Sequence, residues 1–108
     1  MIISKTPMRI SFFGGGTDLP QFYKKEFGCV LSASINKYSY LVVHPAFDDK
    51  NILSYSIREV TNDVGTIKNN RIRAIMKKLN IVKGLEIHSL AEVPAGTGLG
   101  SSSSFTVG

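Results

Sequence analysis

The chain has 108 residues, of which 43% are hydrophobic, and it carries a formal net charge of +5. That composition suits a folded domain with an apolar core and argues against a disordered segment. A single cysteine, Cys29, excludes an intramolecular disulfide and fits a reducing compartment, and we predict it to be a buried strand residue. Residues 1–9 lack a signal-peptide pattern and no run approaches about twenty apolar residues, so we expect a cytoplasmic chain without a membrane partner.

Periodicity, capping residues and glycine positions define the predicted elements of a single unit. The first elements are strand material at 2–3 and 8–13, broken at Pro7, and then a short helix that Thr17 or Asp18 caps and Gly28 closes. Strands follow at 29–36 and 38–45, joined by a turn at 36–37, and another strand at 51–60. The last elements are an amphipathic helix at 68–79, a strand at 85–93 and a helix start near Ser102. Consecutive strands between Cys29 and Val60 without a helix disfavour a doubly wound parallel sheet. We therefore predict an α+β two-layer sandwich, with a mixed or antiparallel sheet and helices on one face.

Much of the positive charge lies on the predicted amphipathic helix. Within residues 71–79 the apolar side chains fall on one stripe, and Arg71, Arg73, Lys77 and Lys78 face mostly away from it. A solvated helix face is the favoured interpretation, and binding of nucleic acid is the weaker alternative. A positive field would also attract an anionic small substrate.

Residues 94–108 are the most informative stretch, a glycine-rich loop that leads into serines and then apolar residues. Gly96, Gly98 and Gly100 remove side chains at alternate positions, so that backbone N–H groups can approach the oxygens of a polyphosphate. The serines suit a helix start, which also favours anions. The spacing does not match a dinucleotide-binding fingerprint, and no lysine follows Lys83 to complete a Walker A loop. A flexible Gly/Ser linker is the remaining alternative.

Residues 93–104 (VPAGTGLGSSSS) resemble the ATP-binding signature of the GHMP kinases, the superfamily of galactokinase and of homoserine, mevalonate and phosphomevalonate kinases. The resemblance implies a ribosomal protein S5 domain 2-like fold, with ATP and Mg²⁺ as cofactors. It also implies that a serine hydroxyl ligates the metal, by position Ser102, with Ser101 as its rival. The implied ATP-binding residues are Pro94, Ala95, Gly96, Thr97, Gly98, Leu99, Gly100, Ser101, Ser102 and Ser103.

Residues 6–20 (TPMRISFFGGGTDLP) resemble the sugar-binding motif of the same family. Gly15 and Gly16 stand where galactokinases carry Glu-His, and this form is similar to the heptose 7-phosphate kinase branch, which leaves room for a larger or phosphorylated sugar. On physical grounds two roles are open for Asp18, which either accepts hydrogen bonds from sugar hydroxyls or only caps a helix. Two roles are also open for Arg9, which either stabilises a phosphoryl group or forms an ion pair on its strand. The implied substrate-binding residues are Gly14, Gly15, Gly16, Thr17 and Asp18, and the implied catalytic residue is Arg9.

The resemblance therefore predicts the N-terminal part of a GHMP sugar kinase, with the C-terminal domain absent from residues 1–108. No acidic residue follows Glu92, although such kinases carry a catalytic aspartate and an acidic metal ligand downstream, so we expect the isolated chain to be inactive. An RNA-binding module of S5-like fold and a nonfunctional truncation product remain as alternatives. His44 and His88 are predicted to be ordinary strand residues, because neither has a metal-ligand partner at a suitable spacing.

Overall fold

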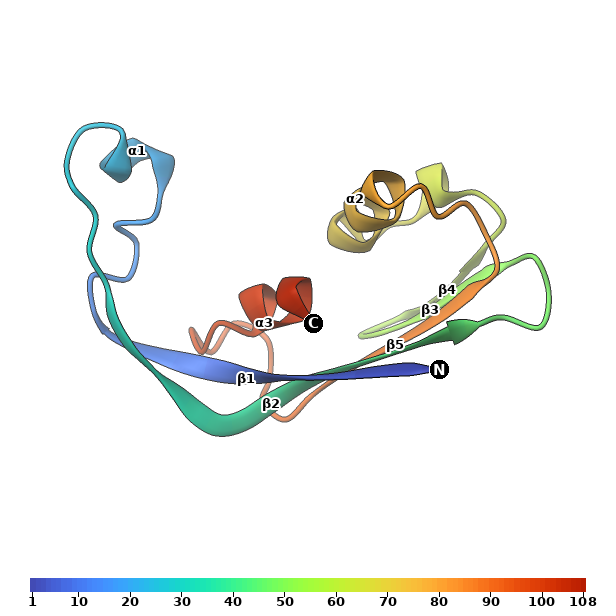
Figure 1. The fold of residues 1–108 in the computed structure, drawn as a ribbon, viewed down its shortest axis with the longest axis horizontal. Helices are drawn as coiled ribbons and strands as arrows, with labels where there is room; N and C mark the ends of the chain where they lie inside the picture. Colours follow the sequence, from blue (N-terminus) through green and yellow to red (C-terminus); the bar gives the residue numbers. More distant parts are fainter.

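The computed structural model describes residues 1–108 as an α+β fold in which one mixed sheet carries its helices on a single face, as predicted (Figure 1). In chain order the elements are β1 (Ile2–Phe13), α1 (Pro20–Tyr23), β2 (Leu31–Pro45), β3 (Asn51–Ser54), β4 (Arg58–Thr61), the 3₁₀ turn η1 (Val64–Thr66), α2 (Asn70–Lys78), β5 (Leu85–Ala91) and α3 (Ser101–Val107).

The sheet has five strands in the order β1-β2-β5-β3-β4. β3 and β5 run parallel, and every other neighbouring pair is antiparallel. β2 pairs with β5 only from Ser39 to Pro45, so the first half of β2 pairs with β1 alone. The β1–β2 ribbon therefore extends beyond the rest of the sheet and carries the loop at residues 14–30 away from the core (Figure 1).

The strand boundaries correct three of the sequence predictions. Pro7 does not interrupt β1, because β1 lies at the sheet edge, where a missing N–H is tolerated. The turn predicted at 36–37 is wrong, since β2 is continuous and its additional residues are absorbed where the register moves from Pro7↔Tyr38 to Arg9↔Ser34. The single strand predicted at 51–60 is instead the β3–β4 hairpin, which turns at residues 55–57.

The short helix is also shorter than predicted. α1 covers only Pro20–Tyr23, its N-cap is Leu19, and neither Thr17 nor Asp18 caps it. Cys29 is exposed, not buried, because it belongs to the connection before β2 and not to the strand. In contrast, α2, β5 and α3 lie where the sequence predicts them.

The apolar core lies between α2 and the sheet. Asn69 caps α2 by accepting hydrogen bonds from the N–H groups of Arg71 and Ile72, and the helix then buries one stripe of side chains. The buried cluster consists of Leu53, Val64, Ile67, Ile72, Met76 and Ile87. This core holds β3, β5 and α2 together by close packing.

Candidate active site

The loop between β5 and α3 is fastened to the edge strand β1. The N–H of Arg9 donates to the carbonyl of Leu99 at 3.1 Å. One turn into α3, the buried Ser104 donates its hydroxyl to the carbonyl of Pro7 at 3.0 Å. These two contacts join segments that lie about ninety residues apart in the sequence and fix the position of the glycine-rich loop.

The three loop glycines all adopt left-handed backbone angles. Their φ values are 83° at Gly96, 74° at Gly98 and 72° at Gly100. At Gly100 a Cβ would lie 3.2 Å from Cγ of Arg9, so this glycine permits the close approach of the loop to β1. At Gly96 and Gly98 a Cβ would meet nothing within 4 Å, which leaves the backbone at these two positions open to a ligand.

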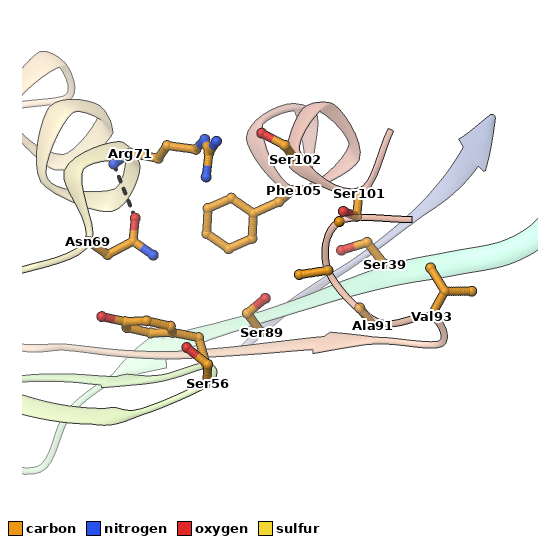
Figure 2. Close-up of a pocket in the computed structure, with 13 residues that line it drawn as sticks. Ser39, Ser56, Asn69, Arg71, Ser89, Ala91, Val93, Ser101, Ser102 and Phe105 are labelled. Atoms are coloured by element: carbon orange, nitrogen blue, oxygen red, sulfur yellow. Dashed lines mark hydrogen bonds between the residues drawn. The ribbon is translucent and has the colours of Figure 1, made fainter. Parts of the chain in front are cut away.

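A cavity of about 510 Å³ opens on the helix-covered face of the sheet (Figure 2). Arg71 of α2 faces Ser102 and Phe105 of α3 across it, and Arg71 has no ion-pair partner in the structure. The residues that line this cavity are Ser39, Tyr55, Ser56, Asn69, Arg71, Ser89, Ala91, Val93, Ala95, Gly96, Ser101, Ser102 and Phe105. An unpaired guanidinium and several hydroxyls suit a polar, anionic ligand.

Tyr55 is held on the wall of this cavity by Glu59. The Tyr55 hydroxyl donates to the Glu59 carboxylate, which also accepts a hydrogen bond from the N–H of Lys68 at 2.7 Å. Burial, followed by the hydrogen bond and the charge of Glu59, raises the pKa of Tyr55 to about 12, so the phenol remains a neutral donor. Desolvation acts to raise the pKa of Glu59, but the hydrogen bonds from Tyr55, Lys68 and Asn69 outweigh it, and the pKa lies below the ordinary 4.5.

A second cavity, of about 500 Å³, lies on the other side of the loop. Arg9 and the exposed Asp18 both line it, and neither residue has an ion-pair partner. Ser11 also lines it, and its buried hydroxyl has no hydrogen-bond partner. The remaining lining residues are Gly14, Gly15, Gly16, Val30 and Gly98.

The glycine turn after β1 is tied to the segment that returns before β2. The hydroxyl of Thr17 donates to the carbonyls of Gly14 at 2.8 Å and Cys29 at 3.2 Å. A Cβ on Gly14 would lie only 1.8 Å from the carbonyl oxygen of Cys29, and one on Gly28 would lie 2.6 Å from that of Thr17. The turn therefore closes only with glycine at positions 14 and 28, and this closure places Asp18 at the cavity.

The structure brings most, but not all, of the predicted site residues to a cavity wall. Arg9, Asp18 and the three turn glycines share the second cavity, and Ala95, Gly96, Ser101 and Ser102 share the first. The predicted residues that line neither cavity are Thr17, Pro94, Thr97, Leu99, Gly100 and Ser103.

Several polar lining residues were not identified from the sequence. Tyr55, Asn69 and Arg71 reach the first cavity only because the hairpin and α2 fold back beside α3. No local pattern marks them, although Arg71 did belong to the cationic face of the predicted helix. Arg73 on the same helix instead donates to the carbonyl of Ile67 and to Asn70, which weakens a continuous basic surface for nucleic acid.

Residues 66–108 match the family model described as GHMP kinases N terminal domain. In this segment the chain is therefore similar to the GHMP kinases. Over 99% of its length it is 29% identical to the D-glycero-alpha-D-manno-heptose 7-phosphate kinase of Campylobacter jejuni. That match covers 35% of the Campylobacter protein, so the chain spans about a third of this GHMP kinase.

Solved GHMP kinases share the fold. A D-glycero-D-manno-heptose 1-phosphate kinase from Bacteroides thetaiotaomicron superposes with a TM-score of 0.83 at 23% identity, over 99% of this chain and 39% of that one. The mevalonate kinase of Methanococcus jannaschii superposes with a TM-score of 0.70 at 22% identity, over 99% of this chain and 37% of that one. The predicted S5 domain 2-like fold of the GHMP kinases is thereby confirmed. None of the helices has the length and apolar character that crossing a bilayer requires.

The close packing at Gly14 predicts a large difference between two alanine substitutions in one turn. Gly16→Ala introduces a Cβ at a positive φ into open space and should lower the free energy of unfolding by about 1–2 kcal/mol. Gly14→Ala carries the same backbone cost and also collides with the carbonyl of Cys29, so it should cost at least about 2 kcal/mol more. Urea unfolding of both variants measures the difference, and equal stabilities would contradict the close approach of Gly14 to Cys29.

The lowered pKa of Glu59 predicts a pH-dependent contribution to stability. The ionised carboxylate stabilises the folded state above the ordinary pKa of 4.5, and this stabilisation is lost as the pH falls through the lower folded-state value. Glu59→Gln should therefore cost about 1 kcal/mol at pH 7, and this cost should shrink at a pH below 4.5.

Urea unfolding at pH 7 and at about pH 3 measures this loss. Glu26→Gln is the control, because Glu26 is exposed and its side chain makes no hydrogen bond, so its substitution should change stability at neither pH. A cost for Glu59→Gln that stays constant down to pH 3 would contradict the assigned role of the carboxylate.

Proposed function

We propose that the chain provides the nucleotide-binding part of an ATP-dependent sugar kinase that phosphorylates a heptose phosphate. The observation that carries the proposal is the position of the glycine-rich loop between two cavities. Gly96 borders the cavity that contains Ser101 and Ser102, and Gly98 borders the cavity that contains Arg9 and Asp18. A phosphoryl group bound along such a loop is close to both ligands at once.

The first cavity is the proposed nucleotide site. Its volume of about 510 Å³ is within the range of small-molecule sites, and the open backbone at Gly96 can present its N–H to phosphate oxygens. Arg71 supplies an unpaired positive charge on the opposite wall, and Tyr55 and Asn69 add neutral hydrogen-bonding groups. These side chains can hold and orient a nucleotide while the loop faces its phosphates.

Magnesium fits this site only as a partner of the nucleotide. Mg²⁺ prefers oxygen ligands, and the exposed hydroxyl of Ser102 provides one, with that of Ser101 beside it. No carboxylate lines the cavity, so phosphate oxygens and water would complete the coordination. When bound, the ion would neutralise charge on the transferring phosphate.

The second cavity is the proposed sugar site. Asp18 can accept hydrogen bonds from sugar hydroxyls, the orphaned hydroxyl of Ser11 can pair with another, and the guanidinium of Arg9 can hold a phosphate. Gly15 and Gly16 line it without side chains, which leaves space for a seven-carbon sugar. The Campylobacter relative is named for a heptose 7-phosphate, which supports this substrate class.

In the proposed reaction a sugar hydroxyl attacks the γ-phosphorus of ATP, its proton is released, and ADP leaves. The residues described here position both ligands and stabilise charge, since phosphoryl transfer depends mainly on these two effects. No acidic residue follows Glu92 to serve as the downstream aspartate of related kinases. We therefore propose that residues 1–108 bind the ligands and do not turn them over by themselves.

Variants that each weaken the binding of one ligand and leave the other unaffected test the two-site proposal. Ser102→Ala should lower the affinity for MgATP roughly tenfold, about 1.4 kcal/mol, and should have no effect on ATP measured with EDTA, because only the metal contact is removed. Asp18→Asn should weaken binding of heptose 7-phosphate and leave MgATP binding unchanged. Isothermal titration of each ligand into each variant measures both effects.

Ser32→Ala is the matched control, because Ser32 is an exposed serine of β2 that lines neither cavity. It should bind both ligands like the unchanged chain. The proposal is wrong if MgATP leaves the amide resonances of Gly96 and Gly98 unshifted, or if Ser102→Ala and Asp18→Asn weaken both ligands equally.

A further inference from the structure

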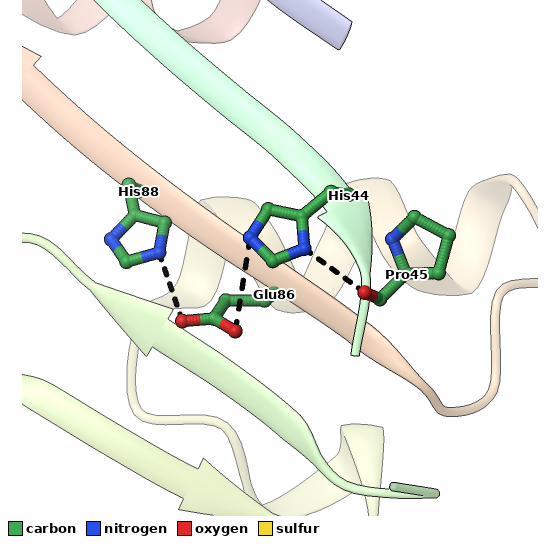
Figure 3. A network of polar contacts seen from close by, with 4 residues as sticks. All are labelled: His44, Pro45, Glu86 and His88. Carbon is green, nitrogen blue, oxygen red and sulfur yellow. Dashed lines mark hydrogen bonds and ion pairs between the residues drawn. The ribbon is translucent and has the colours of Figure 1, made fainter. Parts of the chain in front are cut away.

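We infer that His44, Glu86 and His88 form a binding site for a Zn²⁺ ion on the face of the sheet that carries no helix. The sequence predicted both histidines to be ordinary strand residues without metal-ligand partners, and the structure instead brings them together around one carboxylate (Figure 3). His₂Glu is a ligand set that zinc uses in proteins.

The strand register explains why these three side chains meet. His44 of β2 lies directly opposite Glu86 of β5, and His88 lies two residues after Glu86 on the same strand. Residues two apart on a strand share a face, so all three side chains project to the same side. Ile87 between them projects the other way into the apolar core, which identifies their side as the one without helices.

The distances suit a shared cation. Nε2 of His88 lies 3.0 Å from one carboxylate oxygen of Glu86, and Nε2 of His44 lies 3.7 Å from the other. Ligand atoms around a tetrahedral zinc with bonds of about 2.0 Å are separated by about 3.3 Å. One donor atom from each residue lies within 4.8 Å of the others, so small side-chain adjustments complete the set.

The hydrogen bond on the far side of the His44 ring supports a metal-binding tautomer. Nδ1 of His44 lies 2.9 Å from the carbonyl oxygen of Pro45. A carbonyl only accepts, so Nδ1 carries the proton, and Nε2 of the neutral ring presents its lone pair to the Glu86 carboxylate. Two acceptors facing each other repel unless a cation or a proton lies between them, and a backbone carbonyl on the second nitrogen is the usual partner of a metal-bound imidazole.

The site is accessible and separate from the proposed nucleotide site. The side chains of His44, Glu86 and His88 are 28%, 19% and 37% exposed, which admits an ion and a water in the fourth position. None of the three lines either cavity. Imidazole nitrogens favour zinc and its transition-metal neighbours over Mg²⁺, so the two metal ions would not compete.

Titration of ZnCl₂ into the full chain at about pH 7.5 tests the inference, and the chain contains only these two histidines. We expect one equivalent of Zn²⁺ to bind and to shift the ring resonances of both imidazoles, while Mg²⁺ shifts neither. His44→Ala, His88→Ala and Glu86→Gln should each weaken zinc binding at least about tenfold. Circular dichroism and a thermal melt establish that each variant is folded, and His44→Gln and His88→Gln replace any alanine variant that is not.

Cys29→Ser is the control, because Cys29 offers the chain's only thiolate and lies before the first residue of β2, whereas His44 lies next to the last residue of that strand. It should leave zinc affinity unchanged. Loss of binding in Cys29→Ser, or unchanged affinity in both histidine variants, would overturn the site. Imidazole resonances that respond to pH and not to Zn²⁺ would likewise overturn it, because the carboxylate would then pair only with protonated histidine.

Discussion

The fastening of the β5–α3 loop to β1 is the constraint on which the rest of the site depends. β1 is an edge strand, and the N–H of Arg9 would be an unsatisfied edge donor without the carbonyl of Leu99. Ser104 adds a buried hydroxyl that satisfies the carbonyl of Pro7. Together these bonds cover part of the exposed edge and set the loop glycines between the two cavities.

This constraint also explains the glycine at position 100. Arg9 must pass close to the loop to keep its backbone hydrogen bond, and its side-chain atoms lie 3.2–3.5 Å from the place that a Cβ on residue 100 would occupy. Gly100 thus serves the packing of loop on strand, whereas Gly96 and Gly98 leave backbone open at the cavities. Three glycines with the same backbone angle therefore have two different physical roles.

The sequence predicts those parts of the fold that local chemistry determines. The apolar stripe of α2 and the alternation of β5 lie within short windows, and the structure agrees with both. The Asn69 cap of α2 was not predicted, because the expected helix began at residue 68. The continuity of β2 could not be predicted, because pairing with β1 overrides the turn-like Asn36-Lys37 sequence and converts it into a register shift. The prediction that Cys29 is buried was wrong because strand pairing again decides where the strand begins. β2 starts only at Leu31, so Cys29 lies outside the sheet.

For the candidate site, too, the sequence predicts the contiguous motifs and does not predict which distant residues the fold brings to them. Both glycine motifs could be recognised because each is contiguous in the sequence. That they meet at the second cavity could not be predicted, because it depends on the hydrogen bond between Arg9 and Leu99. Tyr55 and Arg71 reach the proposed nucleotide cavity from other elements, and no spacing in the sequence predicts that approach.

The histidine cluster has the same origin, since His44 and Glu86 become neighbours only through the β2–β5 register. Successive residues of a strand point to opposite faces, so Glu86 and His88 alternate with Ile87, which lies in the core, and with Ser89, which lines the proposed nucleotide cavity. A metal ion that holds β2 to β5 on the open face would therefore also fix the strand pair that forms the floor of the cavity on the other side.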